Sequence, residues 1–532
     1  MTILKYDNDF IYLKGSTFEG SFIGGHYNQT SKHWRVPISL EAIEQLSQVC
    51  DTKPIEPIIK KLNSYRHWVK ELKSNNHTVS YEDSRLRPYQ AVDIEFLKKR
   101  NAAGIFNEQR TGKTPTTLVV VKDANKVVVV CPAGLKLNWQ KEASVWLNRD
   151  SIVVSGPKPN RKLLYKAFST SSSSFLIISY ETLRADLTDF LREIQDIDAL
   201  IADESHRLRN YKTAQSKAVY KVGKVSKKIY ALTGTPAVNH AKDIYGILRL
   251  LKPKKYPSYW QFVERYFTVV EGPFGRDVYG LRKDREKEFS NILFDTSINR
   301  KRKDVMAWIP KVTNTTIPLE FGQKQKRHYL KALKEFMYGI EGEEKDIPNT
   351  LAQLTRLRQI CTEPSLLELD AESVKTEFIK EFLDDNDGSV IIFSSFTSYL
   401  NHLASVVDNA VLLTGEQSAE QKEEAVQLFQ RGDRRVLLAN IRAGGVGFTL
   451  DRGDTIIFVD RSYNPVDNEQ AADRFVPTDP NKEYGAKEII DLVIKGSIEE
   501  NINTLLKTKQ NIISYVNNFM EKGLVDLVKN EL

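Results

Sequence analysis

Short, continuous apolar runs alternate with longer amphipathic stretches over residues 101–253. The apolar runs are rich in β-branched residues and fall at 127–131, 175–178, 200–202 and 229–232. Runs of this length predict strands buried on both faces, and helical stretches between successive strands favour a parallel sheet. We therefore expect an α/β lobe in this part of the chain.

The same alternation returns after a helical, charged region at 323–373. Its apolar runs lie at residues 390–393, 411–413, 436–438, 455–459 and 489–493. They predict a second α/β lobe in series with the first. The segment between the lobes contains an aromatic-rich helical stretch at 256–267, which we expect to be a packing surface without chemistry of its own.

The N-terminal part of the chain, up to residue 78, has aromatic side chains spaced among polar ones. The aromatic positions are Phe10, Tyr12, Phe18, Phe22, Tyr27 and Trp34. An amphipathic helix is expected at 40–49, and the polar and charged stretch at 75–85 is expected to be a linker. We predict an α/β protein with two tandem lobes, at 79–300 and 301–532, preceded by a small α+β domain at 1–78.

The length and composition of the chain are typical of a protein with several folded domains. The chain has 532 residues, of which 41% are hydrophobic and 27% charged, and this favours two or three globular domains over a disordered or fibrous chain. No apolar run approaches the roughly 20 residues that span a bilayer, and the N-terminus has no signal-peptide core. We expect no membrane partner and a cytoplasmic protein of a bacterial or phage-infected cell, or a nuclear one if eukaryotic. The dispersed cysteines Cys50, Cys131 and Cys361 are expected to be packing residues.

Positive charge is modest in total but locally concentrated. The net charge is +8, and basic residues gather at 158–162, 207–212, 252–255 and 300–303. Such clusters are commonly solvated faces. These clusters flank the motifs described next, which favours contact with a phosphate backbone as the alternative.

The run FNEQRTGKT at 106–114 follows an apolar segment and precedes a helical one. In that position, backbone N–H groups and the Lys113 ammonium can cradle phosphates, and the Thr114 hydroxyl can reach Mg²⁺. Gly112 allows the tight turn before the helix. Taken alone, this run is equally typical of an ordinary helix start.

A second motif, which is acidic, makes a nucleotide site the better interpretation than an ordinary helix start. Asp203 and Glu204 end the apolar run at 199–202, which reads as a buried strand that delivers one carboxylate to the Mg²⁺ shell and one to an attacking water. Together with the loop at 106–114, the two carboxylates predict a site for ATP and Mg²⁺.

Further motifs follow in order through both lobes. Those of the first lobe are LRPYQ at 86–90, VCPA at 130–133, LNW at 137–139, ISYE at 178–181, DESH at 203–206 and LTGTP at 232–236, with Asn239 after it. Those of the second lobe are VIIFS at 390–394, LTG at 413–415, LANIRAGGVG at 438–447, YNP at 463–465 and QAADR at 470–474. In order and spacing these motifs resemble superfamily 2 helicases, and most closely the Swi/Snf-like ATPase family of double-stranded DNA translocases.

The resemblance implies two RecA-like lobes and assigns roles by position. The catalytic group would be Lys113, Asp203, Glu204, Gln470 and Arg474. Nucleotide contacts would come from Arg87, Gln90, Gly112, Lys113, Thr114, Asp203, Gly445 and Arg474, with Thr114 and Asp203 on the metal. The DNA strand would be gripped by Pro132, Asn138, Tyr180, Thr235, Thr414, Ile441 and Arg442. A turn or packing role is the alternative for each DNA contact.

Three positions depart from the family pattern. Arg110 stands where glycine is usual, Thr449 stands where asparagine is usual, and Pro477 occupies the place of a second arginine after Arg474. Because an arginine finger contributes about 10³ to 10⁵ in rate in related phosphoryl transfers, either Arg461 or Arg442 would have to substitute, or turnover would be low. Since the other catalytic positions are present, we expect an active enzyme.

The N-terminal part resembles the HARP-type recognition domain of annealing and fork-remodelling helicases, through residues 22–23, 26–28, 32–34 and the helix after Pro37. This resemblance implies DNA contact by Lys32, Trp34 and Arg35, with a core position as the alternative for Trp34. It favours a monomeric translocase that remodels duplex, forked or branched DNA, beside single-strand-binding or replication proteins. The alternatives are a strand-separating DNA or RNA helicase, a catalytically impaired binding scaffold and the motor subunit of a restriction or remodelling complex.

Overall fold

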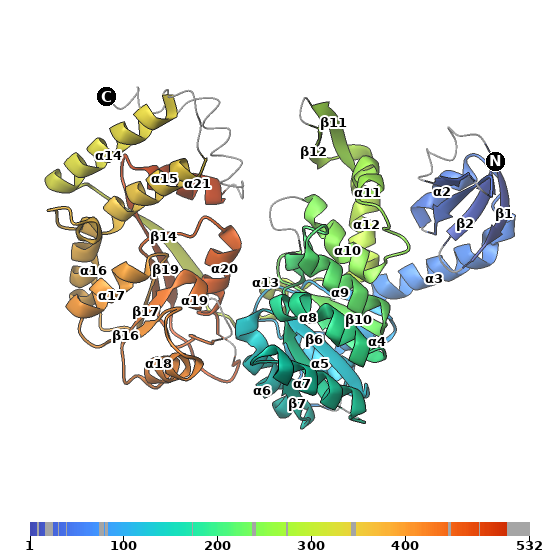
Figure 1. Ribbon diagram of the computed structural model, residues 1–532, viewed down its shortest axis with the longest axis horizontal. Helices are drawn as coiled ribbons and strands as arrows, with labels where there is room; N and C mark the ends of the chain where they lie inside the picture. Colours follow the sequence, from blue (N-terminus) through green and yellow to red (C-terminus); the bar gives the residue numbers. More distant parts are fainter. Residues whose placement is uncertain are drawn as a thin grey trace. The chain divides into compact units, whose positions relative to one another are not determined.

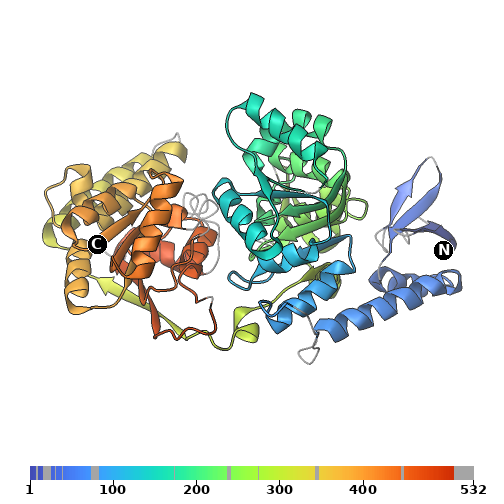
Figure 2. The ribbon, with the colours of Figure 1, turned by 90° about the horizontal axis from the view of Figure 1, so that it is seen from below.

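The computed structural model describes residues 1–7, 10–15, 25–29, 31–38, 40–73, 79, 83–172, 174–236, 241–272, 275–341, 347–444, 448–477 and 479–507. Contacts between residues divide the chain into two compact units, Met1–Val305 and Met306–Leu532. Each unit contains one parallel sheet with helices on both faces (Figures 1 and 2).

The first unit begins with a small antiparallel sheet. Its strands are β1 (Thr2–Tyr6), β2 (Phe10–Lys14), β3 (His26–Asn28) and β4 (His33–Pro37), in the order β1-β2-β4-β3. Helix α2 (Leu40–Ser47) packs on this sheet through Ala42, Ile43 and Leu46, which share a buried cluster with Ile11, Leu13, Trp34 and Val36. The predicted α+β module is therefore present.

Helix α3 (Glu56–Lys73) joins this module to the first lobe. Val69 and Leu72 are buried in the core of the lobe, and Arg66 forms an ion pair of 2.7 Å with Asp295. The hydroxyl of Tyr65 also donates to the carbonyl oxygen of Asp295, at 3.1 Å. The C-terminal half of α3 is thus part of the lobe's structure.

The sheet of the first lobe is entirely parallel, as the apolar runs predicted. Its order is β13-β5-β10-β9-β6-β8-β7. The strands are β5 (Ala102–Ile105), β6 (Lys126–Cys131), β7 (Ser151–Val153), β8 (Ser174–Ser179), β9 (Ile197–Ala202), β10 (Ser226–Leu232) and β13 (Ser297–Ile298). The helices are α4 (Pro88–Lys98), α5 (Lys113–Val120), α6 (Lys136–Leu147), α7 (Lys158–Thr170), α8 (Tyr180–Glu193), α9 (Ala214–Lys224), α10 (Tyr245–Leu251), α11 (Tyr259–Tyr266), α12 (Glu286–Thr296) and α13 (Arg302–Val305).

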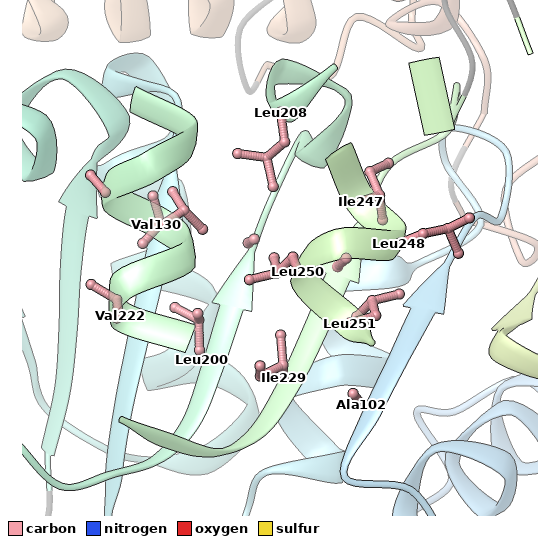
Figure 3. Close-up of a cluster of buried hydrophobic side chains, with 14 of the residues drawn as sticks. Ala102, Val130, Leu200, Leu208, Val222, Ile229, Ile247, Leu248, Leu250 and Leu251 are labelled. Atoms are coloured by element: carbon pink, nitrogen blue, oxygen red, sulfur yellow. The ribbon is translucent and has the colours of Figure 1, made fainter. Parts of the chain in front are cut away.

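Buried aliphatic side chains fill the space between this sheet and its helices. Figure 3 shows Val130, Leu200 and Ile229 from the strands against Val222 of α9 and Leu250 of α10. Each of these side chains is almost or completely inaccessible, which makes the sheet a rigid base for the loops at the ends of its strands.

One feature of the first unit was not predicted. A hairpin of β11 (Phe267–Gly272) and β12 (Gly275–Leu281) follows α11 and stands away from the parallel sheet (Figure 1). The expected aromatic helix is present as α11, and its Phe262 and Tyr266 pack against Phe289. The predicted packing role of this helix is therefore confirmed.

The second unit contains a parallel sheet in the order β14-β19-β18-β15-β17-β16. Its strands are β14 (Val312–Leu319), β15 (Val390–Ser394), β16 (Ala410–Leu413), β17 (Val436–Asn440), β18 (Thr455–Phe458) and β19 (Lys487–Ile494). Its helices are α14 (Gln323–Glu341), α15 (Ile347–Thr362), α16 (Val374–Asp385), α17 (Thr397–Val406), α18 (Ala419–Arg431), α19 (Ile441–Gly444), α20 (Pro465–Asp473) and α21 (Ile498–Lys507). All five predicted strands are confirmed, and β14 is an additional edge strand.

All three cysteines pack in or against a hydrophobic core, as expected. Cys131 and Cys361 are completely buried and Cys50 is partly buried. Burial raises the pKa of the Cys131 and Cys361 thiols, so both stay protonated and act as small apolar groups. Among the described residues, no helix is long and apolar enough to cross a membrane.

Candidate nucleotide-binding site

The loop between β5 and α5, residues 106–112, has a backbone shape suited to phosphate binding and is called the phosphate loop below. Gly112 precedes the first residue of α5 with φ of 77°, and a Cβ at this position would come within 2.5 Å of Nε2 of Gln90. Only glycine fits this site without displacing Gln90. Arg110 is also left-handed, with φ of 67°, which explains why its position is usually glycine in the family that the sequence resembles.

Lys113 is the first residue of α5, and its side chain turns back over the loop. The Nζ atom donates to the carbonyl oxygens of Asn107, at 2.9 Å, and Glu108, at 3.1 Å. Thr114 is the next residue on the helix and is partly buried. The ammonium and the first turn of α5 therefore face the same loop, where a phosphate group would meet both.

Gln90 connects α4 to this loop. Its Nε2 donates to the carbonyl oxygen of Gly112 and to Oγ1 of Thr116, both at 3.1 Å, and its Oε1 accepts from the backbone N–H of Arg87 at 2.8 Å. With 3% exposure, Gln90 braces the phosphate loop. Contact of Gln90 or Arg87 with adenine stays a prediction.

Asp203 follows the last residue of β9 and lies at the carboxyl edge of the sheet. Its Oδ2 accepts from the indole Nε1 of Trp139 at 2.8 Å, and its Oδ1 accepts from the backbone N–H of Glu204 at 2.9 Å. Burial, followed by the neighbouring Glu204 carboxylate, raises the pKa of Asp203 to about 6. Sequence reasoning assigned no role to Trp139, because an indole in an amphipathic helix ordinarily signals packing.

Glu204 has a left-handed backbone, with φ of 48°, which turns its side chain toward the phosphate loop. Gln109 of that loop donates from Nε2 to Oε1 of Glu204 at 3.3 Å, and Nδ1 of His206 lies 3.2 Å from Oε2. Burial alone would raise the pKa of Glu204, but His206, Lys113 and Gln109 outweigh burial and lower it. Of the two adjacent carboxyls, Glu204 is therefore the one that is ionised more readily.

His206 extends these contacts to the end of the next strand. Its Nδ1 lies 3.1 Å from Oγ1 of Thr233, and that oxygen accepts from the backbone N–H of Thr235 at 3.1 Å. The TGT motif after β10 is thus connected through His206 to Glu204. Thr235, a predicted DNA contact, lies within this polar network and is partly buried.

A buried ion pair lies beneath the phosphate loop. Oδ1 of Asp93 accepts from Nε of Arg300 at 2.9 Å, and its Oδ2 accepts from Nδ2 of Asn107 at 2.7 Å. The backbone N–H of Glu108 donates to the carbonyl oxygen of Arg300, and the backbone N–H of Arg302 donates to Oε2 of Glu108. Part of the basic cluster at 300–303 therefore holds the loop in place, a role that sequence reasoning did not assign.

Four of the predicted DNA contacts have buried side chains in the structure. They are Tyr180, Thr414, Ile441 and Trp34. The Tyr180 hydroxyl donates to the carbonyl oxygen of Asp203 at 2.7 Å, so this buried side chain supports the acidic motif. Trp34 belongs to the core of the N-terminal module, which was the stated alternative; Ile441 belongs to a core of the second unit, and Thr414 is a buried polar residue.

The other predicted DNA contacts keep accessible surface. Pro132, Asn138 and Arg35 are partly exposed and Lys32 is exposed. Arg35 stacks over the ring of Phe10 at 4.3 Å, a contact that leaves part of its guanidinium at the surface. Arg442 is 80% exposed and pairs with Asp467 at 3.2 Å.

The second unit supplies the remaining predicted positions. Gln470 lies in α20, and Arg474 caps the end of that helix, with Nη1 3.5 Å from the carbonyl oxygen of Phe448. Gly445 lies outside the described residues. Arg461, offered above as a substitute for the missing second arginine, makes two bonds to Asp491, at 2.6 and 2.9 Å, and is mostly buried. Arg461 therefore has a structural partner, and Arg442 is the more accessible of the two.

Comparison with known proteins defines the class. The SNF2-related domain matches residues 31–366, and the helicase conserved C-terminal domain matches residues 374–476. The chain belongs to the SNF2-related family. The expected resemblance to Swi/Snf-like ATPases is thereby confirmed.

Individual relatives are distant and longer. The chain is 26% identical over 471 residues to the probable ATP-dependent DNA helicase CHR23 of Arabidopsis thaliana, covering 81% of this chain and 43% of that protein. It is 25% identical over 450 residues to mouse chromodomain-helicase-DNA-binding protein 1-like, covering 78% and 48%. It is 24% identical over 412 residues to the human DNA annealing helicase and endonuclease ZRANB3, covering 74% and 37%. The chain spans about half the length, or less, of these relatives.

One solved structure is also similar to this chain. The SWI2/SNF2 ATPase core of Sulfolobus solfataricus in complex with double-stranded DNA is 22% identical, covers 86% of this chain and 98% of that one, and superposes with a TM-score of 0.40.

Proposed function

We propose that this protein is an ATP-driven DNA translocase. The observation that carries the proposal is the convergence of Lys113, Asp203 and Glu204 at the carboxyl edge of one parallel sheet. The Lys113 ammonium is close enough to favour the ionised form of both carboxyls, although burial still raises the pKa of Asp203, and Gln109 of the phosphate loop bonds directly to Glu204. A phosphate cradle beside two acidic groups of different acidity is suited to hydrolysis of a phosphoanhydride.

Each group has a distinct role in this proposal. The N–H groups at the start of α5 and the Lys113 ammonium bind the phosphates, and Glu204 orients the attacking water. The Thr114 hydroxyl and the Asp203 carboxylate fit Mg²⁺, because it prefers hard oxygen ligands, and the ion would neutralise charge on the phosphates. Arg474 of the second unit would add positive charge at the γ-phosphate.

Hydrolysis would then be converted into movement. If ATP joins groups from both units and hydrolysis releases them, two units that each hold a DNA backbone advance along it by alternating their grip. Membership of the SNF2-related family supports this mechanism, and relatives such as CHR23 carry the name of ATP-dependent DNA helicase. DNA is accordingly the proposed partner, and the protein would act as a monomer in the compartment that holds that DNA.

For the DNA substrate we propose forked and branched duplexes, remodelled by fork regression, branch migration or annealing. ZRANB3 is named as a DNA annealing helicase, and the N-terminal α+β module docks on the first lobe through α3. Other relatives are subunits of chromatin-remodelling complexes. Single-strand-binding or replication proteins would be the partners at such forks.

ATPase rates with single-stranded, duplex, forked and four-way DNA, measured side by side, test this proposal. We expect strong stimulation by duplex and the highest rates with forked or four-way DNA. Equal rates with plain duplex and branched DNA would contradict the branched-substrate part. A motor subunit of a larger complex would instead require a co-purifying partner for stimulation.

Strand separation is a second candidate, and the hairpin β11–β12 favours it. The hairpin exposes Val270 and Tyr279, at 47% and 58%, and an exposed aromatic ring such as that of Tyr279 can stack on the bases of separated strands. A displacement assay beside a fork-regression assay distinguishes the two functions. Loss of displacement in Tyr279→Ala, with regression retained, would support the second candidate.

A further inference from the structure

A hydrogen bond joins the side chain of Gln109, in the phosphate loop (residues 106–112), to the Glu204 carboxylate of the acidic motif. Its Nε2 donates to Oε1 of Glu204 at 3.3 Å, across 95 positions of sequence. The other oxygen of that carboxylate, Oε2, lies 3.2 Å from Nδ1 of His206. The bond from Gln109 therefore fixes one oxygen of Glu204, while the other oxygen faces the His206 ring.

The packing of Gln109 restricts its side chain to this arrangement. A Cβ built on Gly234 would lie 3.3 Å from both Cγ and Nε2 of Gln109. Gln109 consequently fills the space that the glycine of the TGT motif leaves open. A side chain confined between Gly234 and Glu204 has few rotamers, so its amide stays directed at the carboxylate.

We propose that Gln109 is a positioning residue for hydrolysis, which holds the Glu204 carboxylate in fixed relation to the loop that binds the phosphates. This inference rests on the proposed function. Because water must be oriented relative to the γ-phosphate, a direct bond from the phosphate loop to Glu204 sets the distance between nucleophile and phosphate. Gln109 touches neither reacting group and acts through Glu204.

Replacement of Gln109 by leucine, which is similar in size but has no donor, tests the proposal. We expect kcat of DNA-stimulated ATP hydrolysis to fall about 10- to 100-fold, as for loss of one hydrogen bond to a charged group. The affinity for ATP, measured by nucleotide binding, should change less than about threefold, because the loop backbone and Lys113 remain. Gln215→Leu, a partly buried glutamine on α9, is the matched control and should keep wild-type values.

A second comparison separates positioning from loop stability. In a Glu204→Ala background, measured by single-turnover hydrolysis, Gln109→Leu should cause no further loss, because its only route to the reaction is absent. Wild-type kcat in Gln109→Leu would overturn the inference, as would equal losses of kcat and nucleotide affinity or an additive loss in the double variant. If the wild-type protein itself hydrolyses no ATP, the proposed function fails instead.

Discussion

The indole Nε1 of Trp139 donates a hydrogen bond of 2.8 Å to Oδ2 of Asp203. Trp139 is almost completely buried on α6, and Asp203 follows β9, so this bond connects a core helix to the acidic motif. It is one of the contacts that lower the pKa of Asp203 against the effect of burial. The indole thereby favours the ionised form of the carboxyl that we propose as a ligand of Mg²⁺.

Trp139→Phe should therefore lower the apparent affinity of the ATPase for Mg²⁺. The ring still fills the core, but the carboxylate loses a donor, a change of about 1.5 to 3 kcal/mol for a charged acceptor. We expect the Mg²⁺ concentration for half-maximal ATPase activity to rise about tenfold or more. Trp146→Phe on the same helix is the control. An unchanged Mg²⁺ dependence in Trp139→Phe would show that the bond has no role in metal binding.

The buried Asp93–Arg300 ion pair under the phosphate loop should contribute strongly to the free energy of unfolding. The side chain of Asp93 is 0% exposed and that of Arg300 is 12% exposed. Asp93→Asn leaves a buried guanidinium without its counter-charge, which typically costs about 3 to 5 kcal/mol. We expect this loss in the free energy of unfolding measured with urea.

The control for that measurement is an exposed pair in the same unit. Lys227 bonds to Asp196 and Asp198 at the surface, with Lys227 61% and Asp196 71% exposed. Lys227→Ala should therefore cost less than about 1 kcal/mol. Equal losses in Asp93→Asn and Lys227→Ala would contradict the structural importance assigned to the buried pair.

Because of Lys487, the free energy of unfolding should increase with pH in the alkaline range. Burial lowers its pKa from 10.5 to about 8, while its ammonium donates to the carbonyl oxygens of Asp451, at 2.9 Å, and Gly453. Between these two pKa values the unfolded chain binds more protons than the folded one, so this group raises the free energy of unfolding as the pH increases.

The matching experiment compares the wild type with Lys487→Met between about pH 8 and pH 10. The difference in unfolding free energy should shift in favour of the wild type by roughly 1 to 3 kcal/mol across this window. The exposed Lys482→Met is the control, since a solvated lysine carries little linkage. Parallel pH profiles of the wild type and Lys487→Met would rule out the lowered pKa.

Arg474 should be the arginine of the second unit that hydrolysis requires. Arg474→Ala is expected to lower kcat by about 10³ to 10⁵ at saturating DNA, the range for an arginine at a transferring phosphoryl group. Arg442→Ala should instead raise the DNA concentration for half-maximal stimulation and reduce its salt dependence, as for a phosphate contact. The exposed Arg434→Ala is the control. Loss of kcat in Arg442→Ala with full activity in Arg474→Ala would reverse these assignments.

The sequence predicted the parts of the fold that depend on continuous burial. Apolar runs such as 127–131 and 436–438 became central strands, because a strand covered on both faces tolerates little else. The edge strand β14 was missed because most of its residues, VTNTTIPL, are exposed and polar and because it includes Pro318. The hairpin β11–β12 was missed for a similar reason, since most of its residues are exposed.

The site was predictable only where local sequence determines geometry. Gly112 and Lys113 predict a phosphate loop, because such a loop needs only a tight turn followed by the start of a helix. Contacts between distant residues leave no such local signal, as with Asp93 and Arg300, which are 207 positions apart. Tyr180 was assigned to the DNA strand by family resemblance, with packing as the alternative, and the resemblance carries no information about its partner, the carbonyl oxygen of Asp203.

The measurement that tests the central claim most directly is phosphate release from ATP with and without duplex DNA, for the wild type, Lys113→Ala and Glu204→Gln. We predict DNA-stimulated release by the wild type, and release near background for both variants while they still bind DNA. No release above background by the wild type with any nucleic acid, or undiminished release by Glu204→Gln, would contradict the account.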